Sequence, residues 1–332
     1  MKKTIAILGA GSFGTSITKL LSSYEKYNII LWSAVKSEIE NIKSDKENKK
    51  FLPGIEIDIK NIKLTTNCED LDSADIVVFA VASKYVREVA KTISKYIKKS
   101  SIIVNTSKGL EEKTFKRLST VIFEETKCEK IVALCGPSHA EEIAKFIPTT
   151  IVASCNNIEI AEYIQKIFSS KYFRVYVNRD IIGVEIAAAL KNIIALAVGI
   201  CDGAGLGDNT KAAIITRGII EIARLGVFLK AEERTFLGLA GVGDLIATCT
   251  SVHSRNKKAG YYIGKGMDVS TALKKVNMVV EGYFVTKTVY QFSKINNISM
   301  PITEELYKIL YENKDIKTTI ENLMNRKVKH EY

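Results

Sequence analysis

A glycine-rich turn near the amino terminus constrains the fold of this chain more than any other sequence feature. Residues 9–14 read GAGSFG, a GxGxxG spacing that directly follows an apolar, Ile-rich run and directly precedes a helical pattern. Such glycines allow a tight turn, close approach to a pyrophosphate and close helix–strand packing. The helix amino terminus favours phosphate. We therefore predict a dinucleotide at Gly9, Gly11 and Gly14, in preference to a glycine turn that only packs a helix on a strand.

The first half of the chain alternates β-rich runs with helical patterns. The expected strands are apolar almost throughout, as in parallel strands covered on both faces; they are Thr4–Leu8, Asn28–Trp32, Asp75–Val81, Ser101–Asn105, Ile131–Cys135, Thr149–Ala153 and Tyr172–Val177. The expected helices between them include Ser83–Tyr96, Lys113–Glu125 and Ile158–Phe168. This alternation predicts an α/β fold with a Rossmann-like, doubly wound sheet.

The pattern becomes helical throughout after Asp180. The expected helices are Glu185–Ile200, Thr210–Leu225, Ala231–Leu237, Tyr261–Lys265, Val269–Val276, Thr286–Asn296 and Thr303–Leu310, the last with an imperfect capping box at Thr303. We therefore predict a dinucleotide-binding domain over residues 1–180 and an all-α substrate domain over residues 181–332. No long linker separates them, so we expect them to pack directly, with a small-molecule site in the cleft.

Length and composition exclude several classes of protein. At about 150 residues per domain, 332 residues predict two domains, and 46% hydrophobic with 26% charged residues exclude a disordered chain. The six cysteines form no CxxC pair, which argues against a disulfide scaffold or a zinc ribbon and favours a cytoplasmic location. No His/Cys/Asp cluster has metal-ligand spacing, so we predict no metal.

The formal net charge of +11 comes from 48 Lys+Arg against 37 Asp+Glu. The lysines are scattered and not interleaved with aromatic residues, so we expect no nucleic acid and favour a phosphorylated small molecule as partner. The amino terminus resembles a signal peptide only superficially, since glycines break its apolar run. We expect no membrane span, because no segment approaches about 20 uncharged apolar residues. The sequence does not determine the oligomeric state, and a homodimer is possible.

The end of the second strand bears on the form of the cofactor. An acid there binds the ribose hydroxyls of NAD, whereas a basic residue suits the 2′-phosphate of NADP. Residues 31–36 read LWSAVK, without an acid and with Lys36 close by. NADP or NAD therefore both fit, with NADPH slightly favoured, although Lys36 could equally be an ordinary surface lysine.

Polar residues in the helical half suggest proton transfer and anion binding. Lys191 ends the apolar segment EIAAALKN, so its ammonium either snorkels to solvent or faces a cleft as a general acid/base. Asp244 and Thr248 share a face if their segment is helical. The Ser254–Asn256 segment opens a helix, where its residues can act as caps or as phosphate ligands. Lys108 follows a strand, at the ligand-facing edge of a doubly wound sheet.

These segments together resemble the NAD(P)-dependent glycerol-3-phosphate dehydrogenase family of the bacterial type. The matching stretches cover nearly the whole chain; they are ILGAGSFGT, FLPGIEI, NTSKGLE, GPSHAEEIAKFIPTTIVAS, GVEIAAALKNIIALAVGICDGAGLGDNTKAAIITRG, GLAGVGDLIATC, SRN and VVEG. The resemblance implies an enzyme that reversibly reduces dihydroxyacetone phosphate to sn-glycerol 3-phosphate for glycerophospholipid synthesis. The family fold, a Rossmann-like domain followed by a helical domain, agrees with the pattern already described.

The resemblance also assigns roles to residues. It implies that Lys191 is the general acid/base at the oxygen of the central carbon and that Lys108 helps to polarise that carbonyl. It also implies that Asp244 and Asn192 bind or orient the substrate and Lys191. The implied substrate-binding residues are Lys108, Gly136, Ser138, Lys191, Asn192, Asp244, Thr248, Ser254, Arg255 and Asn256. Among them, Arg255 and Asn256 are implied to hold the substrate phosphate, with Ser254 at the start of the helix. The implied cofactor-binding residues, beyond the three glycines, are Ser12, Phe13, Ser33, Lys108, Ala140, Arg255, Val279 and Glu281.

Two departures from the family pattern are Ala82-Ser83, where a Pro-Ser pair is common, and Ser33, where a basic residue is common. Three other functions stay open on the sequence. The chain could be a related reductase acting on carboxylates, a dinucleotide-sensing regulator without turnover, or a basic polyanion-binding protein. The joint presence of Lys108, Lys191, Asp244 and Arg255 favours catalysis, because a sensor has no use for an acid/base lysine.

Overall fold

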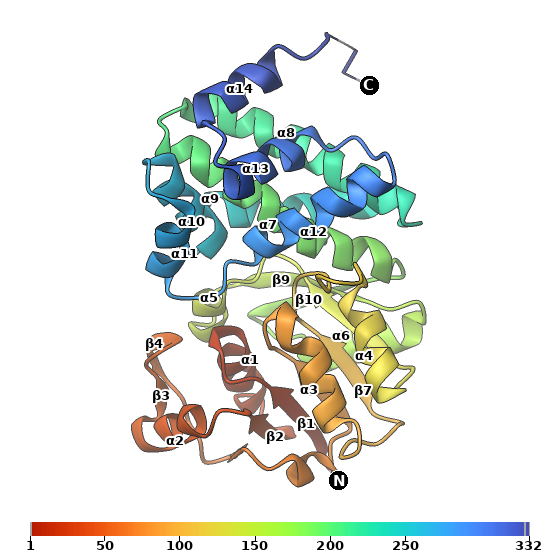
Figure 1. Ribbon diagram of the computed structural model, residues 1–332. Coiled ribbons are helices and arrows are strands. Elements are labelled where there is room, and N and C mark those ends of the chain that lie inside the picture. The colour runs from red at the N-terminus through yellow and green to blue at the C-terminus, as the bar shows by residue number, and fades with distance from the viewer. Residues whose placement is uncertain (1, 329, 332) are drawn as a thin grey trace. The chain divides into compact units, whose positions relative to one another are not determined.

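The computed structural model of the chain describes residues 2–328, 330 and 331 (Figure 1). The chain divides into two compact units, unit 1 with Met1–Glu111 and Lys116–Glu185, and unit 2 with Glu112–Phe115 and Ile186–Tyr332. Unit 1 carries a large sheet flanked by helices, and the elements of unit 2 are helical in the part that is described. The α/β class, with a Rossmann-like sheet followed by helices, is therefore confirmed.

The sheet of unit 1 has the strand order β10-β9-β8-β7-β6-β1-β2-β5. Its strands are β1 (Lys3–Leu8), β2 (Tyr27–Trp32), β5 (Ile62–Thr65), β6 (Ile76–Phe79), β7 (Ile102–Asn105), β8 (Ile131–Cys135), β9 (Thr149–Ser154) and β10 (Phe173–Asn178). Neighbours pair in parallel except β8 and β9, which are antiparallel. Strands β9 and β10 are parallel to each other but run antiparallel to the other strands, so the expectation of a fully parallel sheet was wrong for these two strands.

Helices cover both faces of this sheet, as a doubly wound fold requires. Alternate residues of β1 point to opposite faces, with Ile5 and Ile7 in one buried apolar cluster and Ala6 and Leu8 in the other. The first cluster is completed by α1 (Ser12–Ser22), α2 (Lys36–Asp45), α5 (Ala140–Ala144) and α6 (Ile158–Phe168). The second is completed by α3 (Val86–Ile93), α4 (Leu118–Thr126) and the short 3-10 helix η1 (Cys68–Leu71).

Several expected boundaries in unit 1 were wrong. The helix expected over Ser83–Tyr96 is a 3-10 turn, η2 (Ser83–Tyr85), followed by α3. The helix expected from Lys113 begins only at Leu118, because the preceding backbone turns at Phe115, where φ is +59°. Strand β5 was not predicted from the sequence. A small hairpin, β3 (Glu47–Asn48) with β4 (Leu52–Glu56), was not predicted either.

Unit 2 is built from helices joined by short connections. They are α7 (Ile181–Gly203, which starts in unit 1), α8 (Gly207–Phe228), η3 (Glu233–Leu237), η4 (Leu239–Gly243), α9 (Asp244–Thr250), α10 (Arg255–Gly264), α11 (Val269–Val276), α12 (Glu281–Ile295), α13 (Pro301–Glu312) and α14 (Ile316–Met324). Glycines bring α7 and α10 into backbone contact: a Cβ at Gly199 would lie 2.1 Å from the Lys257 carbonyl oxygen, and one at Gly260 2.1 Å from that of Leu196.

Helix α7 is long and apolar enough to cross a membrane by length and composition, although Glu185 and Lys191 interrupt its apolar sequence. In the structure 94% of its most apolar window is buried, as in the core helix of a folded protein. One expectation fails in the helical region, because the capping box expected at Thr303 is absent from the start of α13. The buried Glu221 carboxylate of α8 accepts from the N–H groups of Ile302 and Thr303, at 2.7 and 3.3 Å, and so caps α13 from another helix.

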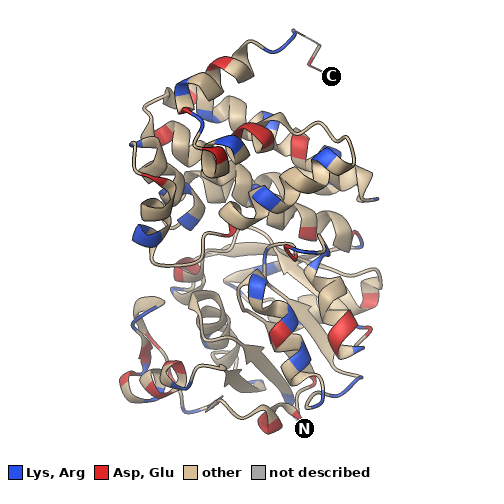
Figure 2. Ribbon diagram, viewed as in Figure 1, with Lys and Arg blue, Asp and Glu red and all other residues tan. Residues whose placement is uncertain are grey.

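Basic and acidic residues, coloured blue and red, are interspersed along the ribbon in Figure 2. Ion pairs join many of them within each unit. In unit 1, Arg87 pairs with Glu111, Glu124 and Glu125 at 2.5–2.9 Å. Many basic side chains are thus paired with acids, and the net charge of +11 is unchanged by these pairs.

Candidate functional site

The glycine turn of unit 1 joins β1 to α1 and fits a bound dinucleotide. Gly9 has φ +109°, and a Cβ at Gly14 would lie 1.9 Å from the Gly9 carbonyl oxygen, so both positions require glycine. A Cβ at Gly11 would meet no atom of the described residues within 4 Å, so this position faces open space. Gly11 is the N-cap of α1 and has no side chain to cap it. The N–H groups of the first turn, at Ser12 and Phe13, are therefore suited to phosphate oxygens.

Asn48 of the β3–β4 hairpin supports this turn and was not predicted from the sequence. Its buried Nδ2 donates to the Ala10 carbonyl oxygen at 2.7 Å and to the Thr15 hydroxyl at 2.8 Å. The hairpin is thereby fixed to the turn and to the first helical residues after it. A single asparagine in a lysine-rich loop carries no sequence signal for such a contact.

The predicted residues Lys108, Gly136 and Ser138 come together at the carboxyl ends of β7 and β8. The Lys108 Nζ donates to the Gly136 carbonyl oxygen at 3.0 Å, and the Ser138 hydroxyl donates to the same oxygen at 2.8 Å. Gly136 has φ +148°, and a Cβ there would lie 3.1 Å from the Ile151 Cα. Ala140, two residues beyond Ser138, begins α5. Parallel neighbouring strands end at one sheet edge, which is where such folds bind ligands.

A buried carboxylate at the end of β7 was also missed. Glu185, in the first part of α7, accepts from the Ser119 N–H at 2.9 Å and from the Arg117 guanidinium at 2.8 Å. It also accepts from the Asn105 amide at 3.4 Å, and the Asn105 Oδ1 in turn accepts from the Ser107 N–H at 3.1 Å. Glu185 therefore ties the end of β7, just before Lys108, to the start of α4.

In unit 2, the predicted residues Lys191, Asp244 and Thr248 form a buried cluster. The Lys191 ammonium donates to Asp244 Oδ1 at 2.7 Å and to the Thr248 hydroxyl at 2.5 Å, and the Lys191 and Asp244 side chains are 7% and 3% exposed. The snorkelling alternative for Lys191 was thus wrong. Asp244 and Thr248 lie one turn apart on α9, as their spacing predicted. Burial raises the pKa of the Cys249 thiol to about 12, so this neighbour stays protonated and is no nucleophile.

A second polar chain in unit 2 joins three segments. The Asn256 Nδ2 donates to the Asn192 Oδ1 at 2.9 Å, and the Asn256 Oδ1 accepts from the Gly282 N–H at 2.8 Å. It therefore links α7, α10 and the start of α12, where Glu281 is buried as the first helical residue and Val279 lies just before it.

The phosphate-binding residues predicted next to Asn256 lie at the start of α10. The buried Ser254 hydroxyl caps the helix by accepting from the Lys257 N–H at 3.3 Å, which confirms its expected capping position. Arg255 is the first helical residue and is exposed.

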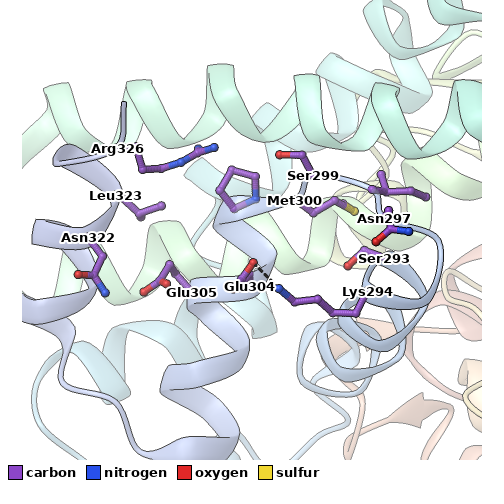
Figure 3. Close-up of a pocket in the computed structure, with 12 residues that line it drawn as sticks. Ser293, Lys294, Asn297, Ser299, Met300, Glu304, Glu305, Asn322, Leu323 and Arg326 are labelled. Carbon is purple, nitrogen blue, oxygen red and sulfur yellow. Dashed lines mark ion pairs between the residues drawn. The ribbon is translucent and has the colours of Figure 1, made fainter. Parts of the chain in front are cut away.

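Unit 2 also holds two cavities lined by other residues. One, of about 410 Å³, lies among α12, α13 and α14 and contains the Lys294–Glu304 ion pair at 3.0 Å (Figure 3). The other, of about 710 Å³, is mainly apolar and is lined by α7, α8, α13, α14 and the chain beyond α14. In the part of the chain that is described, the lining of neither cavity includes a predicted site residue.

The site residues thus fall into groups that geometry brings together. Within unit 1 these are the glycine turn, and Lys108 with Gly136 and Ser138. Within unit 2 they are Lys191 with Asp244 and Thr248, and Asn192 with Asn256. No group of three His, Cys, Asp or Glu residues placed to hold a metal occurs among residues 2–328, 330 and 331.

Comparisons with known proteins place this chain in a family. The model for the NAD-dependent glycerol-3-phosphate dehydrogenase N-terminus matches residues 4–161, and that for its C-terminus matches residues 180–321. The glycerol-3-phosphate dehydrogenase (NAD(P)+) of Thermoanaerobacter sp. (strain X514) is 48% identical over 329 residues, covering 98% of each chain. That of Bacillus velezensis is 48% identical over 332 residues, covering 99% of this chain and 96% of the other. The crystal structure of glycerol-3-phosphate dehydrogenase from Coxiella burnetii has a TM-score of 0.93 at 33% identity, covering 98% of this chain and 99% of the other. This chain therefore belongs to the NAD-dependent glycerol-3-phosphate dehydrogenase family.

Proposed function

We propose that this protein reversibly reduces dihydroxyacetone phosphate to sn-glycerol 3-phosphate with NADH or NADPH, and that the product supplies glycerophospholipid synthesis. The family membership over nearly the full chain supports the reaction. The single structural observation that carries it is the buried Lys191–Asp244–Thr248 cluster, which provides a fixed proton donor. The nicotinamide cofactor, when bound, supplies the hydride.

Lys191 is the general acid/base of this proposal. Its ammonium protonates the developing alkoxide at the central carbon in the reducing direction, and its amine takes the proton back in the other. Asp244 and Thr248 hold the Nζ in one position, since each contacts it at 2.7 Å or less. A cation fixed in this way needs no reorganisation as negative charge develops on the substrate oxygen.

Lys108 is proposed to polarise the substrate carbonyl, with Gly136 and Ser138 as further substrate contacts. The Gly136 carbonyl oxygen positions the Lys108 Nζ, because it accepts its hydrogen bond at 3.0 Å. The phosphate group is proposed to bind at Arg255 and Asn256 at the start of α10, where Arg255 supplies an exposed guanidinium beside the cap residue Ser254. Asn192, which accepts from the Asn256 amide at 2.9 Å, is proposed to contact the substrate as well.

Unit 1 contains most of the residues proposed to bind the dinucleotide. Residues 1–180 are proposed as the cofactor domain and residues 181–332 as the substrate domain. The cofactor contacts carried forward as predictions are Gly9, Gly11, Ser12, Phe13, Gly14, Ser33, Lys108, Ala140, Arg255, Val279 and Glu281. We also propose a cytoplasmic location, which the six free thiols support, and a homodimer remains to be tested by gel filtration.

The decisive experiment follows the absorbance of NADH and of NADPH after addition of dihydroxyacetone phosphate to the pure protein. Oxidation with the phosphate ester but not with dihydroxyacetone supports the proposal. Lys191→Ala should abolish turnover and leave dinucleotide affinity nearly unchanged, whereas Lys294→Ala, which removes a surface ion pair of unit 2, should keep the rate.

Other outcomes of this experiment refute the proposal. Oxidation of NADH or NADPH by 2-oxo acids instead would indicate a related reductase whose substrates carry a carboxylate. Dinucleotide binding without any turnover, insensitive to Lys191→Ala, would indicate a sensor. Retention on DNA that salt abolishes, without dinucleotide binding, would indicate a polyanion-binding protein.

A further inference from the structure

We propose that Glu38 recognises the adenosine ribose hydroxyls of the dinucleotide and makes the protein prefer NADH over NADPH. The inference rests on the proposed function, which requires a dinucleotide at the glycine turn. It concerns the end of β2, where the sequence shows no acid and therefore slightly favoured NADPH.

The end of β2 lies directly beside the glycine turn. Leu8 of β1 pairs in register with Trp32 of β2, and the Gly9 N–H donates to the Trp32 carbonyl oxygen at 2.8 Å. Ser33 is therefore the first residue beyond the strand at the edge that faces the turn. In a fold of this kind the adenosine ribose lies at this position, and the residues here discriminate between the two dinucleotides.

The carboxylate missing from the strand is supplied by the next helix. Glu38 lies in the first turn of α2, and the Ser33 hydroxyl donates to its Oε2 at 2.6 Å. The same hydroxyl accepts from the Val35 N–H at 3.1 Å, so both the serine and the carboxylate are fixed. Glu38 is only half-buried, and a carboxylate offers about four acceptor sites. Acceptor capacity thus remains for the 2′- and 3′-hydroxyls of a ribose.

Two lysines near this strand end are paired with acids. Lys36, the residue that could meet a 2′-phosphate, pairs with Glu40 at 3.3 Å, with both side chains exposed. Lys63 of β5, the strand next to β2, pairs with Asp70 at 2.6 Å. The chain contains no arginine before Arg87, whereas arginine is the usual partner of a 2′-phosphate. A dianionic 2′-phosphate would thus face the Glu38 carboxylate without a dedicated cation.

The test measures the dissociation constants of NADH and NADPH by fluorescence titration, together with kcat/KM for each, on three proteins. For the wild type we expect NADH to bind at least about tenfold more tightly. Glu38→Gln keeps the shape of the side chain and removes its charge, so the NADH/NADPH affinity ratio should fall about tenfold, mainly through tighter NADPH binding. Glu40→Gln removes a carboxylate of the same helix that contacts Lys36 instead of Ser33, and its ratio should equal that of the wild type.

The opposite results overturn the inference. Equal or tighter binding of NADPH by the wild type would show that hairpin lysines or another cation recognise the 2′-phosphate. An unchanged ratio in Glu38→Gln would show that the Ser33–Glu38 hydrogen bond serves only the start of α2. NADH-selective binding that Glu38→Gln abolishes, without turnover of dihydroxyacetone phosphate, would support the role of Glu38 and refute the proposed reaction.

Discussion

The buried pair of Lys191 and Asp244 makes a prediction about stability and activity together. Lys191→Met or Asp244→Leu alone leaves one buried charge without its partner, which costs about 3–5 kcal/mol of the free energy of unfolding. The double variant removes both charges, and such replacements by apolar residues are often neutral. It leaves no new unpaired group at Thr248, whose hydroxyl still donates to the backbone carbonyl of residue 244 at 2.6 Å. We therefore expect the free energy of unfolding of the double variant to lie within about 2 kcal/mol of the wild-type value. This corresponds to a coupling energy between the two residues of at least about 4 kcal/mol.

The free energy of unfolding of the three variants is measured by urea unfolding followed by far-UV circular dichroism. Tryptophan fluorescence is less suitable, because Trp32, the single tryptophan, lies in unit 1 and reports on the sheet. Oxidation of NADH with dihydroxyacetone phosphate measures activity. All three variants should lose about 10²–10⁴-fold in kcat, because the proton donor is absent or displaced. If the destabilisation of the double variant equals the sum of the single ones, or if Lys191→Met keeps most of its rate, the reasoning is refuted.

Three further predictions concern other parts of the structure. Gly260→Ala places a Cβ 2.1 Å from the Leu196 carbonyl oxygen and should lower the free energy of unfolding by about 2–3 kcal/mol, whereas Gly238→Ala, whose nearest contact is 3.4 Å, should change it by less than about 1 kcal/mol in the same urea titration. Burial raises the pKa of Glu221 from 4.5 to about 7, so its protonated form gives stability that is complete below about pH 4.5 and is lost as the pH rises through about 7. The side chain in Glu221→Gln cannot ionise, so the substitution should remove up to about 3 kcal/mol of the change in the free energy of unfolding between about pH 5 and 8. A variant whose urea midpoint changes with pH as steeply as that of the wild type would contradict this. Arg255→Ala should raise the KM for dihydroxyacetone phosphate about 10–100-fold in steady-state kinetics with little change in kcat, and an unchanged KM would place the phosphate elsewhere.

The sequence located most strands of unit 1 but not their directions. An apolar run such as Thr149–Ala153 shows that a strand is covered on both faces, and this property is the same for either direction. Direction depends on the connection, and between β8 and β9 the chain has only the five-residue helix α5, Ala140–Ala144. A full crossover helix is what usually returns the chain to a parallel course. The four-residue strand β5 was missed because so short a run has no measurable periodicity.

The candidate site shows the same division between local and distant information. The four-residue spacing of Asp244 and Thr248 predicted that they share a face of α9, and Ser254 was expected to cap a helix, because helix geometry fixes both relations. The contact of Lys191 with Asp244, 53 residues away, came only from the family resemblance and not from spacing. Glu185 and Asn48 were missed for the same reason, since each contacts segments far from it in sequence.

The start of α2 bears on the expected form of the cofactor. The rule for the second strand looks for an acid at its last residue, and residues 31–36 have none, which favoured NADPH. The rule rests on where a carboxylate lies and not on which residue carries it. A glutamate in the first turn of the following helix reaches back about one turn, and the Ser33 hydroxyl holds the Glu38 carboxylate at 2.6 Å beside the strand end. A carboxylate therefore lies at this edge of the sheet, supplied from five residues further along the chain, and under the proposal made for Glu38 the cofactor preference should follow the position of that charge.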